Sequence, residues 1–347
     1  MTSHDDSDRS DAPARLRDVA ERAGVDPSLV SRVLSGSLPF SIRGETRERI
    51  VAAAADLDYR PNVQARALRR RRSMLIGMLV PTLSNVIYER IHAGASARAA
   101  ELGYSLVIAA GPAEQFPDLL RGQVDGLLLA VATETQPPVA VSRGAHVPIV
   151  LVNRSGFHGL TSVTVDDAAG ARLATRHLCE LGHRRVAHLA GPTGLDTARR
   201  RRDGFLEACR EHLGEAGSEP LIVEGGYTER DGFAGMQALL DRPDRPSAVF
   251  VANLQAAIGA LAAARQLGLR VPVDVSVASV HDAPLAEYLD PPLTTVRMPL
   301  EEMGRKAVEV VLSGRCEDGE SFRVDVPPVL IVRDSTSLPR ATGLDFP

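Results

Sequence analysis

The sequence predicts an α/β protein in which a small all-α segment precedes a larger core of parallel β-sheets. The 45 residues from Arg15 to Tyr59 place apolar side chains at helical spacing. After Ser73, runs rich in Val, Ile and Leu alternate with amphipathic helical intervals, which is typical of parallel sheets covered on both faces. This second region is too long for one α/β domain of ordinary size, so we expect a doubly wound core with two lobes.

The all-α segment is expected to contain three short helices. The inward-facing residues of the first are Leu16, Val19, Ala20 and Ala23, and Gly24 marks its end. The second begins with Asp26 as N-cap and Pro27 at its first position, and its inward-facing residues are Leu29, Val30, Val33 and Leu34. The third runs from about Glu45 to Leu57, with inward-facing Ile50, Val51, Ala54 and Leu57. Residues 1–14 are acidic without periodicity, and we expect a disordered tail there.

Two short helices joined by a turn at Gly24 match a helix-turn-helix, whose second helix enters the major groove of DNA. With the apolar side chains turned inward, the outer face of this helix carries Pro27, Ser28, Ser31 and Arg32. An arginine can donate two hydrogen bonds to guanine, and serine hydroxyls can bind bases or phosphates. The alternative is an ordinary helical bundle in which these side chains only face water.

The distribution of charge favours DNA binding. The 347-residue chain has a net charge of −4, with 40 Lys and Arg against 44 Asp and Glu. Residues 13–72 nevertheless contain 13 Arg and 7 acidic residues, a net charge of +6, whereas residues 73–347 carry −7. A local positive charge on a helix-turn-helix is what binding to DNA phosphates requires. We therefore predict a DNA-binding domain at residues 15–60 and a linker at 61–72, in which Arg69–Arg72 either contacts phosphate or remains solvated.

The predicted core covers residues 73–338, and a disordered tail is expected at 339–347. Its candidate strands are Met74–Val80, Tyr104–Ala110, Val124–Val131, Pro148–Asn153, Arg185–Ala190, Leu221–Glu224, Ala248–Ala252 and Val275–Val280. Its candidate helices are Tyr88–Leu102, Ala168–Leu181, Arg199–His212, Gly232–Asp241 and Gln255–Leu267.

Polar or aromatic side chains follow five of these strands. They are Asn85 to Tyr88, Asn153, Tyr227, Asn253, and the pair His281 and Asp282. Ligands of open parallel sheets bind at the carboxyl ends of the strands, where Asn and Asp suit a polar ligand and Tyr offers a flat surface. A helix cap or a solvated loop would explain any one of these residues. The agreement across five strands favours a binding site.

Composition and motifs argue against several other classes. With 44% hydrophobic and 24% charged residues the chain is typical of a globular protein, and no apolar run approaches the ~18–20 residues of a membrane helix. The three cysteines, Cys179, Cys209 and Cys316, are odd in number and lack a CxxC spacing, which suits a reducing compartment. Because the first residues also lack the pattern of a secretory signal, we expect a cytoplasmic protein.

We expect neither catalysis nor a cofactor nor a bound metal. The chain has no GxGxxG after a strand, no GxxxxGKS or GxxxxGKT, no HExxH and no GxSxG. His177, His183 and His188 do not have the spacing of metal ligands. Three classes remain, in decreasing order of support: a ligand-responsive DNA-binding regulator, a solute-binding protein and an α/β enzyme.

Several segments resemble the LacI family of bacterial transcription regulators. In chain order they are LRDVAERAGVDPSLVSRVLSG at 16–36, ETRERI at 45–50, LDYRPN at 57–62, IGMLVP at 76–81, VDGLLL at 124–129, ELGHRRV at 180–186 and PPLTTV at 291–296. The resemblance covers about residues 15–337. It implies a helix-turn-helix head, a periplasmic-binding-protein-like core, a small sugar-like or anionic effector, and a homodimer that represses transcription from near-palindromic operator DNA.

The resemblance also implies roles for residues of the head and the linker. Ser28 and Arg32 correspond to base-reading positions, Ser31 to a phosphate contact, and Pro27 to a reading position whose contact here is apolar. Residues 62–68 resemble a hinge that becomes helical on DNA, which adds Asn62, Arg66 and Leu68 to the expected DNA-binding residues. Leu68 corresponds to a leucine wedged into the minor groove. The segment Ser35–Arg43 is about two residues longer than the usual pattern.

In the core, the resemblance places one set of residues at effector-contacting positions. With the neighbouring Asp282, the expected set is Ile87, Tyr88, Asn153, Arg201, Tyr227, Asn253, His281 and Asp282. Many relatives have acidic residues where this chain has Leu254 and His281. His281 could instead donate to an anionic or carbonyl-bearing ligand or form a pH-sensitive contact, and Arg199–Arg202 also permits an anion.

Overall fold

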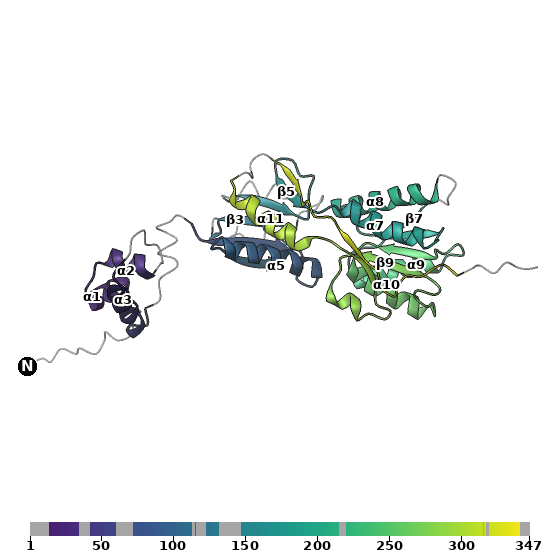
Figure 1. Ribbon diagram of the computed structural model, residues 1–347. Coiled ribbons are helices and arrows are strands. Elements are labelled where there is room, and N and C mark those ends of the chain that lie inside the picture. The colour runs from purple at the N-terminus through teal and green to yellow at the C-terminus, as the bar shows by residue number, and fades with distance from the viewer. Residues whose placement is uncertain are drawn as a thin grey trace, which may run out of the picture. The chain divides into compact units, whose positions relative to one another are not determined.

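The computed structural model describes residues 14–34, 42–59, 72–112, 115, 123–131, 147–214, 220–314, 316 and 319–340. It divides into two compact units, Met1–Arg72 and Ser73–Pro347 (Figure 1). The first unit contains the expected three helices, and the second contains the α/β core.

The N-terminal unit consists of α1 (Leu16–Ala23), α2 (Pro27–Leu34) and α3 (Gly44–Asp56) around a small apolar core. Gly24 ends α1 with a φ of 63°, which a residue without a side chain adopts at no steric cost. Asp26 is the expected N-cap of α2, because its Oδ1 accepts a hydrogen bond of 2.8 Å from the Ser28 backbone N–H.

The prediction for one inward-facing residue of α3 is wrong. The Val51 side chain is 50% exposed, and Ala53 is buried instead. Ile50, Ala53, Ala54 and Leu57 follow the i, i+3, i+4, i+7 spacing of one helix face, from which Val51 is turned by one residue.

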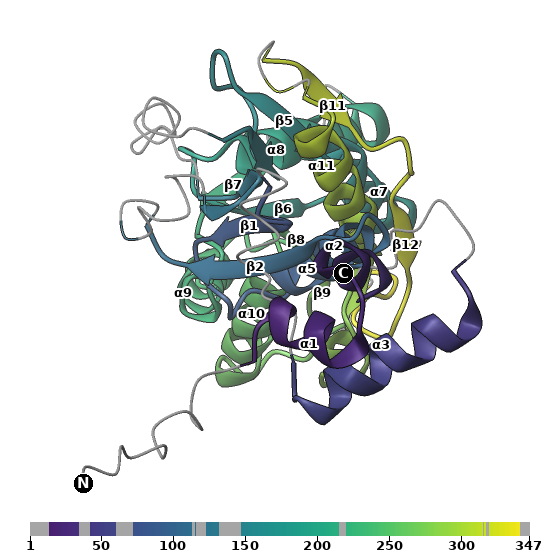
Figure 2. The same ribbon diagram turned by 90° about the vertical axis from the view of Figure 1, so that its left-hand side faces the viewer.

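The core contains two six-stranded sheets. The first has the order β11-β5-β4-β3-β1-β2, with β1 (Leu75–Val80), β2 (Ser105–Ala110), β3 (Gly126–Leu129), β4 (Ile149–Val152), β5 (Thr161–Thr164) and β11 (Ser321–Arg323). The second has the order β12-β10-β9-β8-β6-β7, with β6 (Val186–Ala190), β7 (Leu221–Glu224), β8 (Ala248–Val251), β9 (Ser276–Val280), β10 (Thr294–Arg297) and β12 (Val329–Ile331). All neighbours are parallel except β10 and β12. The turned view shows the pairing of β1 with β2 (Figure 2).

In the described part of the core, six α-helices cover these sheets. Against the first sheet pack α5 (Val86–Glu101) and α11 (Leu300–Leu312). On one face of the second sheet lie α7 (Asp167–Glu180) and α8 (Asp196–Leu213), and on the other face lie α9 (Glu229–Leu240) and α10 (Leu254–Gln266). The eight expected strands and five expected core helices are present, within a few residues of their predicted ends. Five further elements, β5, β10, β11, β12 and α11, were not predicted from the sequence.

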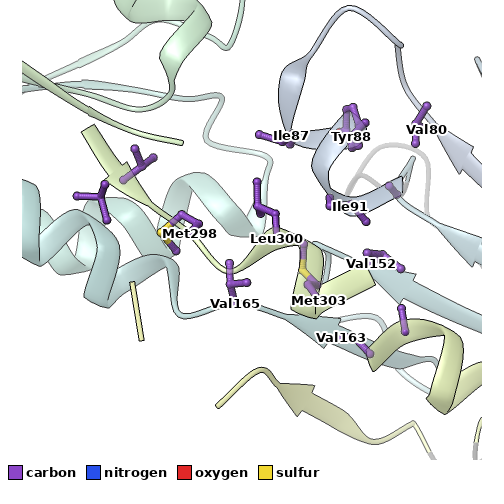
Figure 3. Packing of buried hydrophobic residues seen from close by; sticks show 14 of the residues in the cluster. Val80, Ile87, Tyr88, Ile91, Val152, Val163, Val165, Met298, Leu300 and Met303 are labelled. Atoms are coloured by element: carbon purple, nitrogen blue, oxygen red, sulfur yellow. The ribbon is translucent and has the colours of Figure 1, made fainter. Parts of the chain in front are cut away.

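Three segments cross between the two lobes in the described part of the core. We call 165–166, 298–299 and 324–328 the crossing segments. The first and third lie side by side, because β5 pairs with β11 and the Val324 N–H donates to the Thr164 carbonyl oxygen at 2.9 Å. Apolar side chains of the first two, Val165 and Met298, pack in one cluster with Leu300 (Figure 3).

Candidate functional site

A cavity of about 390 Å³ opens where the carboxyl ends of both sheets meet. It is lined by Pro81, Thr82, Ser84, Asn85, Tyr88, Gly111, Pro112, Ala130, Val131, Arg154, Leu195, Tyr227, Thr228, Glu229 and Gln255. Most of these residues lie in the segments that follow β1, β2, β3, β4, β6 or β7. The cavity therefore lies where open parallel sheets bind ligands, and its volume suits a small molecule.

A smaller recess of about 20 Å³ shares four residues with this cavity. It is lined by Asn85, Ile87, Tyr88, Asn153, Arg154, Thr197, Arg201, Tyr227, Asn253 and His281. The structure thus brings together seven of the eight residues expected at the effector site, every one except Asp282. Ile87 and Tyr88 lie in the first turn of α5, where Asn85 caps the helix by accepting from the Ile87 N–H at 3.2 Å.

Asp282 belongs to a different set of contacts, so the expectation for this residue is not met. Its carboxylate accepts from Thr295 Oγ1 at 2.7 Å, from Arg333 Nη2 at 2.8 Å and from Arg297 Nη2 at 2.9 Å. Against the effect of burial, these donors hold the pKa of Asp282 below its usual value. Asp282 is held by these partners, whereas its neighbour His281 lines the recess.

The Arg201 guanidinium is a buried element of the recess and is tied to a buried acid. The side chain is 2% exposed, and its Nε and Nη2 donate to Asp167 Oδ1 at 2.9 and 2.7 Å. Its Nη1 donates to the Ala252 carbonyl oxygen at 2.8 Å, and the guanidinium lies 5.6 Å from the centre of the Tyr227 ring. Burial raises the pKa of Asp167, but Arg201 and Arg200 more than offset this and hold it below its usual value.

His281 is neutral, and its proton position is set by Arg201. Arg201 Nη2 lies 3.1 Å from His281 Nε2, and a guanidinium can only donate. Nε2 is therefore the acceptor, and the ring proton is on Nδ1. Burial, together with the charge of Arg201, holds the pKa of His281 well below its usual value. The backbone of His281 has a φ of 75°, in the left-handed region that non-glycine residues seldom adopt.

The asparagines of the recess differ in what they offer a ligand. Asn253 Oδ1 accepts from the Ala256 N–H at 2.9 Å and so caps α10, and its Nδ2 donates to the Tyr227 carbonyl oxygen at 3.0 Å. Asn153 also has a left-handed backbone, with a φ of 58°, and its Oδ1 is buried without a partner among the described residues. Asn253 thus shapes the recess, whereas Asn153 has an acceptor to spare.

The four residues of α2 expected to contact DNA differ in exposure. Pro27, Ser28 and Arg32 are exposed and Ser31 is half-buried. Arg32 Nε donates to the Ser28 carbonyl oxygen at 3.2 Å, and Nη2 donates to Ser28 Oγ at 3.3 Å. Asn62, Arg66 and Leu68 lie outside the described residues, as do most of Ser35–Arg43 and Arg69–Arg71 of the basic run.

Comparison with known proteins decides the family. A model described as bacterial regulatory proteins of the lacI family matches residues 15–62, and one described as a periplasmic binding protein-like domain matches residues 175–336. The ribose operon repressor of Escherichia coli (strain K12) is 33% identical over 332 residues, covering 93% of this chain and 99% of the relative. The chain belongs to the LacI family. It is accordingly a transcription regulator with a helix-turn-helix head and a two-lobed effector core.

Solved structures of other LacI-family proteins share this fold. The lac repressor dimer bound to operator and the anti-inducer ONPF has a TM-score of 0.80 and 31% identity, over 94% of this chain and 100% of that chain. The complex of the regulator CelR with cellobiose has a TM-score of 0.69 and 32% identity, over 93% of this chain and 99% of that chain. These relatives are regulators rather than enzymes.

Sequence reasoning missed three polar residues of this LacI-family core. Arg154 and Thr197 line the recess, and Asp167 holds Arg201 from behind it. Arg154 immediately follows the expected Asn153, and Thr197 precedes the arginine run by two residues. Nothing in the local pattern marked Asp167 as a partner of Arg201, since the two residues belong to different helices. None of the described helices combines the length and hydrophobicity needed to span a membrane.

Proposed function

We propose that this LacI-family chain is a homodimeric repressor whose affinity for operator DNA is changed by a small polar effector. The observation that carries the proposal is the gathering of seven expected side chains in one recess at the junction of the two lobes. The effector is a sugar or a related metabolite, bound in the recess and in the adjoining cavity. Two heads related by twofold symmetry would bind the two halves of a near-palindromic operator.

DNA recognition is assigned to the exposed first turns of α2. Pro27 and Ser28 stand at the amino end of the helix, where backbone N–H groups favour phosphate. Ser31 and Arg32 follow on the same side, and the Arg32 guanidinium lies within hydrogen-bonding distance of Ser28. The proposal gives Arg32 the base contact and gives the serines base or phosphate contacts. Asn62, Arg66 and Leu68 would contact the minor groove between the half-sites.

Arg32→Ala is expected to weaken binding to the selected operator by about 1–3 kcal/mol. The physical reason is the loss of a base contact, so binding to random DNA should fall much less. Titration of a selected and a scrambled duplex at one salt concentration measures both affinities. Arg22→Ala, which removes an exposed arginine of α1 paired at 3.6 Å with Asp56, is the matched control. Unchanged discrimination between the two duplexes in Arg32→Ala would contradict the base-reading role.

Leu68→Ala is expected to lower the affinity for operator while leaving effector binding by the core intact. A leucine that opens a base step in the minor groove contributes only when the protein is on DNA. Operator affinity and the ligand-induced shift of the melting temperature separate the two effects. A variant that loses both would show that Leu68 stabilises the core rather than the complex with DNA.

A further inference from the structure

Two buried polar atoms of the recess have no hydrogen-bond partner among the described residues. They are His281 Nδ1 and Asn153 Oδ1, and each residue is only 2% exposed. His281 follows β9 in one lobe and Asn153 follows β4 in the other, and both have left-handed backbones. An unpaired buried polar atom destabilises the folded protein, so a ligand that forms a hydrogen bond with each of the two atoms gains affinity from both.

The hydrogen-bonding character of His281 is fixed by Arg201. Asp167 holds Arg201, and Arg201 donates to His281 Nε2, which leaves the His281 Nδ1–H as a donor toward the recess. Asn153 Oδ1 is an acceptor. The recess therefore presents one donor and one acceptor from opposite lobes.

The arginines near the recess are already engaged by acids or by oxygen acceptors. Asp167 pairs with Arg201 and, through Oδ2, with Arg200 at 2.7 Å, and Asp196 pairs with Arg200 as well. Arg154 donates from Nη1 to the Asn153 carbonyl oxygen at 2.7 Å and interacts with the Tyr88 hydroxyl. Arg200 and Arg201 of α8 thus contribute paired charge rather than a counter-charge for an anion.

The size of the recess also favours a small uncharged group over an anion such as phosphate. A volume of about 20 Å³ holds roughly one water-sized group. A hydroxyl fits this space, whereas a phosphate group with its four oxygens does not. The remainder of a ligand has the cavity of about 390 Å³, which Pro81, Pro112 and Leu195 make partly apolar.

We propose that His281 and Asn153 form a donor–acceptor pair that selects an uncharged effector group able to accept and to donate. A hydroxyl meets this requirement, and so does the edge of an amide that carries adjacent C=O and N–H groups. A carboxylate or a fully ionised phosphate can only accept hydrogen bonds. Its oxygen would face Asn153 Oδ1 without a hydrogen bond, which is unfavourable in a buried site. This inference rests on the proposed function, because it assigns the ligand class of the same site.

The first test is a thermal-shift panel on the full chain. Each neutral probe is paired with charged forms of the same skeleton: D-glucose with D-glucuronate and glucose 6-phosphate, D-ribose with ribose 5-phosphate, and uracil with orotate. A ligand of the folded state raises the melting temperature by mass action, so we expect the larger shifts from neutral members. The proposal is wrong if the charged members give the larger shifts, or if no neutral probe shifts the transition.

The second test changes the hydrogen-bonding character of His281. His281→Asn keeps a side-chain donor, and His281→Asp replaces the donor by an acceptor; both new residues tolerate a left-handed backbone. Calorimetry measures the affinity of each variant for the neutral probe that gives the largest thermal shift. We expect His281→Asn to bind within about tenfold of wild type, and His281→Asp to lose roughly tenfold to a hundredfold in affinity. His158→Asp, at an exposed histidine outside both cavity linings, is the control.

Two further readouts separate the possible failures. The melting temperature without ligand shows whether a variant is merely less stable, whereas a reversed ranking of neutral and charged probes cannot come from lost stability. Equal losses for His281→Asn and His281→Asp would overturn the role of the donor. DNA selection with the same preparations tests the regulator function alone, since a chain that selects no operator can still rank the probes as expected.

Discussion

Removal of residues 1–60 is expected to abolish sequence-specific DNA binding and to leave ligand binding by the core intact. Specific binding by such proteins exceeds non-specific binding by about 4–10 kcal/mol, and all the proposed base contacts of α2 lie in the deleted part. The core from Ser73 is a compact unit with its own apolar clusters, so its effector site persists.

The measurement begins with selection of duplexes from a random library by the full chain. Affinities of the full and truncated chains for the selected duplex are then compared at a fixed salt concentration, because phosphate contacts make affinity salt-dependent. The thermal response of the truncated chain to the neutral probes is the control. Tight binding of the selected duplex by the truncated chain would refute the assignment of the N-terminal unit.

Asp167→Ala is expected to destabilise the core by about 3–5 kcal/mol, because it leaves Arg201 buried without its acid partner. Arg200 loses one of its two acids in the same substitution. Denaturant unfolding of full-length wild type and variant gives the difference in the free energy of unfolding. Asp244→Ala breaks the exposed pair with Arg242 and should leave that free energy close to the wild-type value. A similar small change for Asp167→Ala would show that the buried pair is not a structural anchor.

The same substitution has a pH signature with a definite sign. Arg201 and Arg200 outweigh the effect of burial and hold the pKa of Asp167 below 3.8 in the folded protein. The stabilisation is therefore fully present above the ordinary pKa and is lost as the pH falls through the folded value. Wild type should lose this part of its stability in acid, and Asp167→Ala should lack that component at every pH.

The expected strands could be found from the sequence because their residues are buried on both faces. Leu127, Leu128 and Leu129 of β3 form an unbroken apolar run for this reason. β5 has the sequence TSVT, whose small polar side chains are buried through pairing and contacts rather than through hydrophobicity, so no apolar run marked it. β11 and β12 have three residues each and are too short for a periodic signal.

For the candidate site too, features that depend on local sequence could be predicted, whereas contacts between distant residues could not. The ends of the strands could be located from the sequence, and the site residues Asn153, Tyr227 and Asn253 were predicted because they follow those ends. Which of two neighbours faces the recess depends on the exact register of the strand end, and this decided between His281 and Asp282. The partnership of Asp167 with Arg201 joins two helices, so it depends on tertiary packing that no spacing within the sequence expresses.

The three crossing segments have a mechanical consequence. Three tethers that lie close together favour rotation of the two lobes about the tethers over sliding of one lobe past the other. We therefore expect a change in the angle between the lobes to be the easiest movement of this core. His281 and Asn153 stand on opposite sides of that joint. A ligand that bridges these two residues fixes the angle between the lobes. Because the lobes have little other relative movement, the core loses little conformational entropy when the ligand binds.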